Sequence, residues 1–162
     1  MDLVLKAKKI LPSNNYVGFS LTQGNLYRKK GWSIDKFIEV AKEVLKRNNI
    51  PVFFVQKEHV EIIKKIKHNI NGVIFPEELS KFKGPAFVTA LSTRLKQAIS
   101  IDNGIMHMMS LSNIPMIVLF GPTSSDKFAP KINEIKIIDS KKIYNSTDIN
   151  KISVEDVINN LN

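Results

Sequence analysis

Short apolar runs that alternate with amphipathic stretches constrain the fold of this 162-residue chain more than any other feature. Runs rich in β-branched and aromatic residues occupy 16–21, 51–55, 72–75, 98–101, 115–120 and 135–138. Several are apolar nearly throughout, which is typical of strands that are covered on both faces. Between them, apolar residues recur at the spacing of a helix. The alternation predicts an α/β fold with a doubly wound, Rossmann-like parallel sheet whose last strand lies at an edge.

The predicted helices follow from caps and from apolar periodicity. They are a helix that follows Ser33 and ends at Asn48, one in which Val60, Ile63 and Ile66 face the core, one over 87–96, one from Asp102 to about Ser112, and a final one capped by Ser153.

Composition excludes several classes of protein. With 43% hydrophobic residues the chain can build a core, so overall disorder is excluded. The absence of cysteine removes disulfides, thiolate metal sites and cysteine nucleophiles. No apolar run approaches the ~20 residues that cross a bilayer, and the first residues lack the pattern of a secretory signal. We therefore expect a cytoplasmic protein.

The net charge of +9 raises the question of a polyanionic partner. Only Arg28, Arg47 and Arg94 are arginines, so 21 of the 24 basic residues are lysines, and these are scattered along the chain. Base readout and bidentate phosphate contacts favour arginine. The pattern indicates that most of these lysines are solvated surface residues and that the chain has no specific nucleic-acid partner. The alternative is a non-catalytic module that binds nucleic acid or anionic lipid.

The segment Asp102 to His107 carries the most informative motif. It directly follows a predicted strand, and ligands of such sheets sit beyond the carboxyl ends of the strands. Gly104 would leave the start of the next helix open to an anion, and Asp102 and His107 could reach the same ligand. A sugar diphosphate fits this combination. The same residues are also common in a plain turn with Asp102 as an N-cap.

Two further segments follow predicted strands at the same edge. Phe120 to Thr123 offers a tight turn with a hydroxyl, and is also an ordinary end to a strand. Lys30-Gly31-Trp32 offers a lysine for phosphate and a tryptophan for a pocket wall, or else a surface lysine beside a core tryptophan. Together, the three segments strengthen the prediction of an anionic ligand.

These residues resemble glycosyltransferase family nine, the ADP-heptose lipopolysaccharide heptosyltransferases, in the C-terminal half that binds the nucleotide sugar. The resemblance lies in Lys30-Gly31-Trp32, in the segment Asp102 to His107, in the strand and turn from Pro115 to Thr123, and in the closing segment Lys151 to Val157, and it spans about residues 16–161.

The resemblance implies one lobe of a GT-B fold and an inverting, metal-independent transfer of a heptose to the lipopolysaccharide core. Asp102, Gly104 and His107 would contact the sugar and diphosphate of the donor, and Lys30 would balance the charge of the departing diphosphate. Asn25, Asn103 and Thr123 would be further donor contacts, and Glu58 would contact the ribose. No cofactor is expected beyond the nucleotide sugar, which is a substrate.

Three positions depart from the family pattern. Asn103 replaces a serine or threonine, Ser33 replaces a proline, and Gly84-Pro85-Ala86-Phe87 replaces a stretch that begins Gly-x-Thr/Ser. These changes are compatible with a nucleotide sugar as the donor, but they put in question whether its sugar is a heptose.

The resemblance also implies a division of the chain. Residues 1–15 would be the remnant of an interdomain linker, and residues 16–162 the nucleotide-sugar-binding domain. The N-terminal domain of the family holds the catalytic base and the acceptor site, so we expect this half alone to bind donor and transfer nothing. The acceptor would be a lipid-linked saccharide, at the inner face of the inner membrane. A metal site built from His59, His68 and His107 is not expected, because the paired spacing of known sites is missing.

Overall fold

A computed structural model of the protein describes residues 2–22 and 31–162, so the predicted site residues Asn25 and Lys30 lie outside the described residues. The elements in chain order are α1 (Leu3–Ile10), β1 (Tyr16–Ser20), α2 (Ile34–Lys46), β2 (Ile50–Phe53), α3 (Val60–Asn69), the 3-10 helix η2 (Pro76–Leu79), α4 (Pro85–Ser92), β3 (Leu95–Ile101), α5 (Gly104–Ser110), β4 (Met116–Phe120), α6 (Ser125–Phe128), β5 (Ile135–Asp139), α7 (Ser140–Tyr144), the 3-10 helix η3 (Ile149–Lys151) and α8 (Val154–Ile158).

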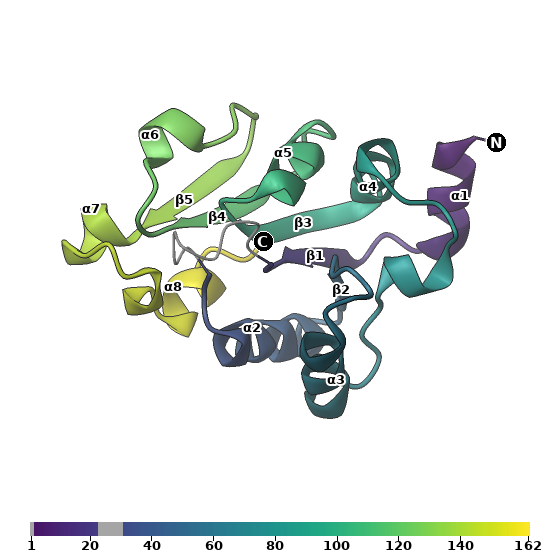
Figure 1. The fold of residues 1–162 in the computed structure, drawn as a ribbon, viewed down its shortest axis with the longest axis horizontal. Helices are drawn as coiled ribbons and strands as arrows, with labels where there is room; N and C mark the ends of the chain where they lie inside the picture. Colours follow the sequence, from purple (N-terminus) through teal and green to yellow (C-terminus); the bar gives the residue numbers. More distant parts are fainter. Residues whose placement is uncertain (1, 23–30) are drawn as a thin grey trace.

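The five strands form one sheet in the order β2-β1-β3-β4-β5, and every neighbouring pair is parallel. Helices α4 and α5 lie over one face of the sheet, and α2 and α3 lie over the other (Figure 1). This arrangement confirms the predicted doubly wound sheet, with β5 at an edge as expected.

Each face of the sheet has its own hydrophobic core, because successive side chains of a strand point to opposite faces. In β4, Ile117 and Leu119 join the cluster under α2 and α8, whereas Val118 and Phe120 join the cluster under α4 and α5. Burial on both faces explains why this strand is apolar throughout.

Trp32 belongs to the first of these cores. Its side chain is 3% exposed, its ring packs edge-on against Phe37 at 4.9 Å, and its Nε1 donates a hydrogen bond to the carbonyl of Ile152 at 3.0 Å. Of the two interpretations of this tryptophan, the structure therefore supports the core residue, which ties the start of α2 to the segment before α8.

Three local predictions were wrong. Residues 72–75 form a single bridge between Ile74 and Val52, because the left-handed Gly72 and the helix-initiating Pro76 leave too few residues for a strand. The helix expected over 87–96 ends at Ser92, since the chain from Leu95 onward pairs with β1.

The third wrong prediction concerns α3, which begins at Val60. Val60 is 49% exposed at the first position of the helix, whereas Ile63 and Ile66 face the core as expected.

The segment predicted to be a linker contains α1. Ala7 and Leu11 are fully buried in the core under α4 and α5, and the Arg94 guanidinium donates to the carbonyl of Leu11 at 3.0 Å. Residues 3–11 thus pack onto the sheet domain, and the division at residue 15 stays a prediction. Within the described ranges, no helix has the length and hydropathy needed to cross a bilayer.

Candidate functional site

The strand order places a topological switch point between β1 and β3. From β1 the chain passes through α2 to β2 on one side, and it then crosses to β3, β4 and β5 on the other side. The connections that leave the carboxyl ends of β1 and β3 therefore diverge to opposite faces of the sheet. Such a point opens a crevice, which is where sheets of this kind bind their ligands.

Asn103 joins the two strands at this crevice. Its Nδ2 donates to the Ser20 hydroxyl at 2.8 Å and to the Thr22 carbonyl at 3.0 Å, at the end of β1. Its Oδ1 accepts the backbone N–H of Met106 at 2.9 Å and so caps α5, and the Ser100 hydroxyl lies 3.5 Å from the same oxygen. The amide predicted to contact the donor is thus engaged in a bridge between β1, β3 and α5.

The other residues of the Asp102 to His107 segment surround the start of α5. Asp102 is 6% exposed at the end of β3. Gly104 is exposed, and a Cβ placed on it would meet, beyond its own turn of chain, none of the described residues within 4 Å. His107 is also exposed and lies three residues further along, on the same side of the helix as Gly104. The structure therefore brings an open backbone and an imidazole together beside a buried carboxylate.

The turn from Gly121 to Thr123 follows β4, next to β3 at the same edge of the sheet. A Cβ on Gly121 would approach the backbone N of Ile149 and the carbonyl oxygen of Thr147 at 3.0 Å each, so only glycine fits this close approach. The side chain of Thr123 is 9% exposed, and its hydroxyl is buried without a hydrogen-bond partner among the residues that the structure describes. Buried hydroxyls without partners are uncommon and call for an explanation.

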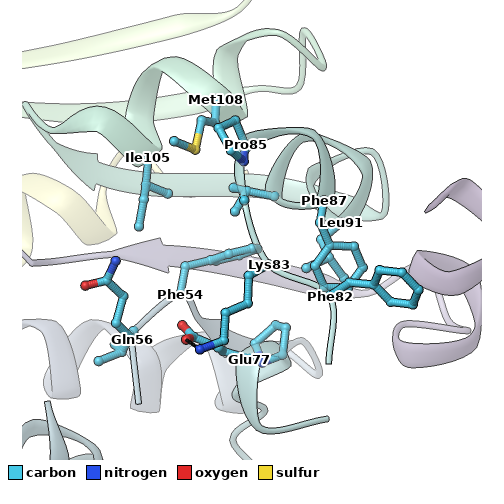
Figure 2. Close-up of a pocket in the computed structure, with 14 residues that line it drawn as sticks. Phe54, Gln56, Glu77, Phe82, Lys83, Pro85, Phe87, Leu91, Ile105 and Met108 are labelled. Atoms are coloured by element: carbon cyan, nitrogen blue, oxygen red, sulfur yellow. Dashed lines mark ion pairs between the residues drawn. The ribbon is translucent and has the colours of Figure 1, made fainter. Parts of the chain in front are cut away.

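A pocket of about 310 Å³ lies on the α4 and α5 side of the sheet, beyond the end of β2. Aromatic and aliphatic side chains from α4, from α5 and from the segments after β2 and before α4 form most of its wall. Figure 2 shows several of them converging on one space: Phe54, Phe82, Pro85, Phe87, Leu91, Ile105 and Met108. The volume and the apolar lining are those of a small-molecule site.

Polar groups occur at a few points of this pocket. Gln56 lines it after β2, and Lys83 forms an ion pair with Glu77 across it at 3.7 Å (Figure 2). Glu58, the residue predicted to contact a ribose, is exposed two positions beyond Gln56 and does not line the pocket. A planar apolar group with polar edges, such as a nucleobase, matches this combination.

Sequence reasoning missed this pocket, although one signal was present. Helix α4 is only eight residues long and carries apolar residues on most of its surface, including Phe87, Val88 and Leu91. A short helix of this kind needs apolar neighbours on more than one side. The partner side chains come from segments far apart in the chain, so their convergence is a property of the fold.

The three histidines are not brought together. His59 and His68 flank or belong to α3, on one face of the sheet, while His107 belongs to α5 on the other face (Figure 1). In the described part of the chain, no three His, Asp or Glu side chains are grouped as they would be around a metal ion.

Comparison with known families gives a match over residues 4–158 to "Glycosyltransferase family 9 (heptosyltransferase)". The chain belongs to glycosyltransferase family 9. The match covers all of the described site residues and confirms the family that the three segments indicated.

Solved structures of family 9 proteins share the fold. A glycosyl transferase family 9 structure from Veillonella parvula DSM 2008 has a TM-score of 0.82 at 17% identity, over 98% of this chain and 50% of that one. The E. coli ADP-heptose LPS heptosyltransferase II has a TM-score of 0.77 at 17% identity, over 97% and 49%. E. coli heptosyltransferase WaaC with ADP has a TM-score of 0.76 at 14% identity, over 95% and 46%.

The family 9 chain described here thus spans about half the length of these structures, and it has the fold of one lobe of a GT-B glycosyltransferase. A comparison with curated protein sequences gives no significant match.

Proposed function

We propose that this chain is the donor-binding lobe of a heptosyltransferase-like glycosyltransferase and that it binds a nucleoside diphosphate sugar. The observation that carries the proposal is the open start of α5 at the β1/β3 switch point, where Gly104 leaves space above the backbone beside Asp102 and His107. Membership of glycosyltransferase family 9 and the ADP in the WaaC structure support the same ligand.

The order of the loops along the sheet edge supports a proposed direction for the ligand. The apolar pocket lies beyond β2, the crevice lies between β1 and β3, and the Gly121–Thr123 turn follows β4. The base would occupy the pocket and the diphosphate would cross the crevice above Gly104. The distal phosphate would then lie toward the turn, with the sugar beyond it.

Each site residue has a proposed role in an inverting, metal-independent transfer to a lipid-linked saccharide of the lipopolysaccharide core. Asp102 and His107 would bind the sugar and the diphosphate, and Lys30 would balance the charge of the departing diphosphate. Asn25 and Glu58 would be peripheral donor contacts. Glu58 would lie on the side of the nucleobase. The base that deprotonates the acceptor would come from an acceptor-binding lobe, on this or another polypeptide, at the cytoplasmic face of the membrane. Without that lobe, we expect binding and no transfer.

Calorimetric titration of the 162-residue protein with ADP, GDP, UDP and their sugars tests the proposal. We expect saturable binding of at least one nucleoside diphosphate. The substitution His107→Ala should weaken binding about fivefold, the value of one hydrogen bond. His68→Ala, an exposed histidine on α3, is the matched control and should leave the affinity unchanged.

A salt titration separates this function from general polyanion binding by the lysine-rich surface. Binding of an oligonucleotide through phosphate contacts falls steeply with salt. If no nucleotide binds at millimolar concentration while an oligonucleotide binds at low salt, the donor-binding proposal is wrong.

A further inference from the structure

Lys141 forms hydrogen bonds with the backbone of the Gly121–Thr123 turn. The Lys141 ammonium donates to the carbonyl oxygen of Gly121 and to that of Thr123, the latter at 2.6 Å. The same ammonium pairs with the Asp139 carboxylate at 3.2 Å, and the Lys141 side chain is only 33% exposed. One partly buried charge thus holds both ends of a three-residue turn.

Asp139 in turn is fixed by the residues around it. It is 2% exposed at the end of β5, and its two oxygens accept the Ser125 hydroxyl at 2.6 Å and the backbone N–H of Lys141 at 2.9 Å. Burial alone would raise the pKa of Asp139, but the hydrogen bonds from Ser125 and Lys141 outweigh it, so the pKa lies below its usual value. The carboxylate is therefore charged at neutral pH and available to hold Lys141.

Lys141, Asp139 and Ser125 thus hold the turn that follows β4, the strand next to β3 in the sheet. The turn is held from one side by Lys141 and from the other by the close approach of Gly121 to the backbone at Thr147 and Ile149. It nonetheless leaves the Thr123 hydroxyl buried and without a partner among the described residues. A turn that is held in place before binding lowers the ordering cost of a ligand contact, and its unsatisfied hydroxyl is a polar group for which the described residues give no partner.

We propose that Lys141 is a positioning residue which, held by Asp139 and Ser125, fixes the Gly121–Thr123 turn for contact with the distal phosphate of the donor. The inference rests on the proposed function, because the direction proposed for the donor along the sheet edge brings its distal phosphate to this turn. Lys141 acts through the turn and does not itself touch the ligand.

The decisive experiment compares ADP with AMP, which lacks the distal phosphate. In Lys141→Met we expect the affinity for ADP to fall about tenfold and that for AMP to change less than about twofold. A general structural defect would weaken both ligands equally and would overturn the proposal.

The variant Asp139→Asn separates positioning from simple electrostatics. Removing a negative charge near an anion should strengthen ADP binding by Coulomb attraction alone. Positioning predicts the opposite, a loss of about fivefold for ADP with AMP unchanged. Equal or tighter ADP binding in Asp139→Asn would overturn the role of this network.

Matched controls come from an ion pair on the adjacent surface. Lys142 and Asp126 pair at 2.7 Å with side chains 58% and 83% exposed, and Lys142→Met and Asp126→Asn make the same charge changes. Both should bind ADP like the unmodified protein.

Two further results complete the test. If Asp139→Asn or Lys141→Met fails to fold, as judged by thermal unfolding, Ser125→Ala removes one hydrogen bond and should still weaken ADP about threefold with AMP unchanged. If the unmodified protein binds neither nucleotide, the proposed function fails and this inference fails with it. If Lys141→Met, Asp139→Asn and Ser125→Ala all bind ADP normally, the role of Lys141 is wrong while the proposed function stands.

Discussion

Replacing Gly104 by alanine is expected to weaken ADP binding by at least about tenfold, because the new methyl group occupies the space through which the diphosphate approaches the backbone. A Cβ at this position has no neighbour within 4 Å in the described part of the chain, apart from atoms of its own turn. The methyl group would therefore be tolerated by the protein and would obstruct only the ligand. Calorimetric titration measures the loss.

The stability of Gly104→Ala separates obstruction from damage to the fold. Gly104 is the first residue of α5 and has no positive φ, and alanine is the better helix former, so the unfolding midpoint should stay the same or rise by up to about 4 °C. Leu111→Ala, at the other end of α5 where the side chain is 75% exposed, is the control and should change neither quantity. Unchanged ADP affinity in Gly104→Ala would contradict the placement of the diphosphate.

Replacing Asn103 by alanine is expected to destabilise the folded protein by about 2–4 kcal/mol, since it removes the cap of α5 and leaves the Ser20 hydroxyl and the Thr22 carbonyl without their amide partner. For a chain of this length the thermal midpoint should fall by about 5–12 °C. Thermal or urea unfolding measures the change.

Asn103→Ser divides this loss into its two parts. A serine hydroxyl can still accept the N–H of Met106 and cap α5, but it is too short to reach the end of β1. We therefore expect about half the destabilisation of Asn103→Ala. A serine variant as unstable as the alanine variant would mean that the bridge between β1 and β3, and not the cap, carries the whole effect. Asn69→Ala, on an exposed position of α3, is the control.

Much of the sheet could be predicted from the sequence because strands such as β4 are buried on both faces and appear as continuous apolar runs. The final helix could be predicted because Ser153 and Asp156 form a capping box within four residues. Predictions failed where tertiary contacts decide. Residues 93–96 were expected in a helix, and pairing with β1 draws Leu95 into β3 instead.

The candidate site could be predicted only where its residues are close together in the sequence. The segment Asp102 to His107 is local, so its motif locates the open start of α5. The partners of Asn103 are not local, since Ser20 lies 83 positions away, and the residue predicted to contact the donor turns out to bridge two strands. The pocket and the Lys141 network likewise join residues from separate elements, and no spacing in the sequence marks them.

Backbone NMR of the 18.4 kDa protein during titration with ADP tests the central claim most directly, because it locates the ligand on the fold. We predict amide shifts at 102–107 around the start of α5, at 54–56 and 84–88 around the pocket, and at 121–124 in the turn after β4. The groove at the opposite end of the sheet, lined by Gln97, Met116 and Lys136 among others, should stay unperturbed. Shifts confined to that groove, or spread over exposed lysines with none at 102–107, would contradict donor binding at the switch point.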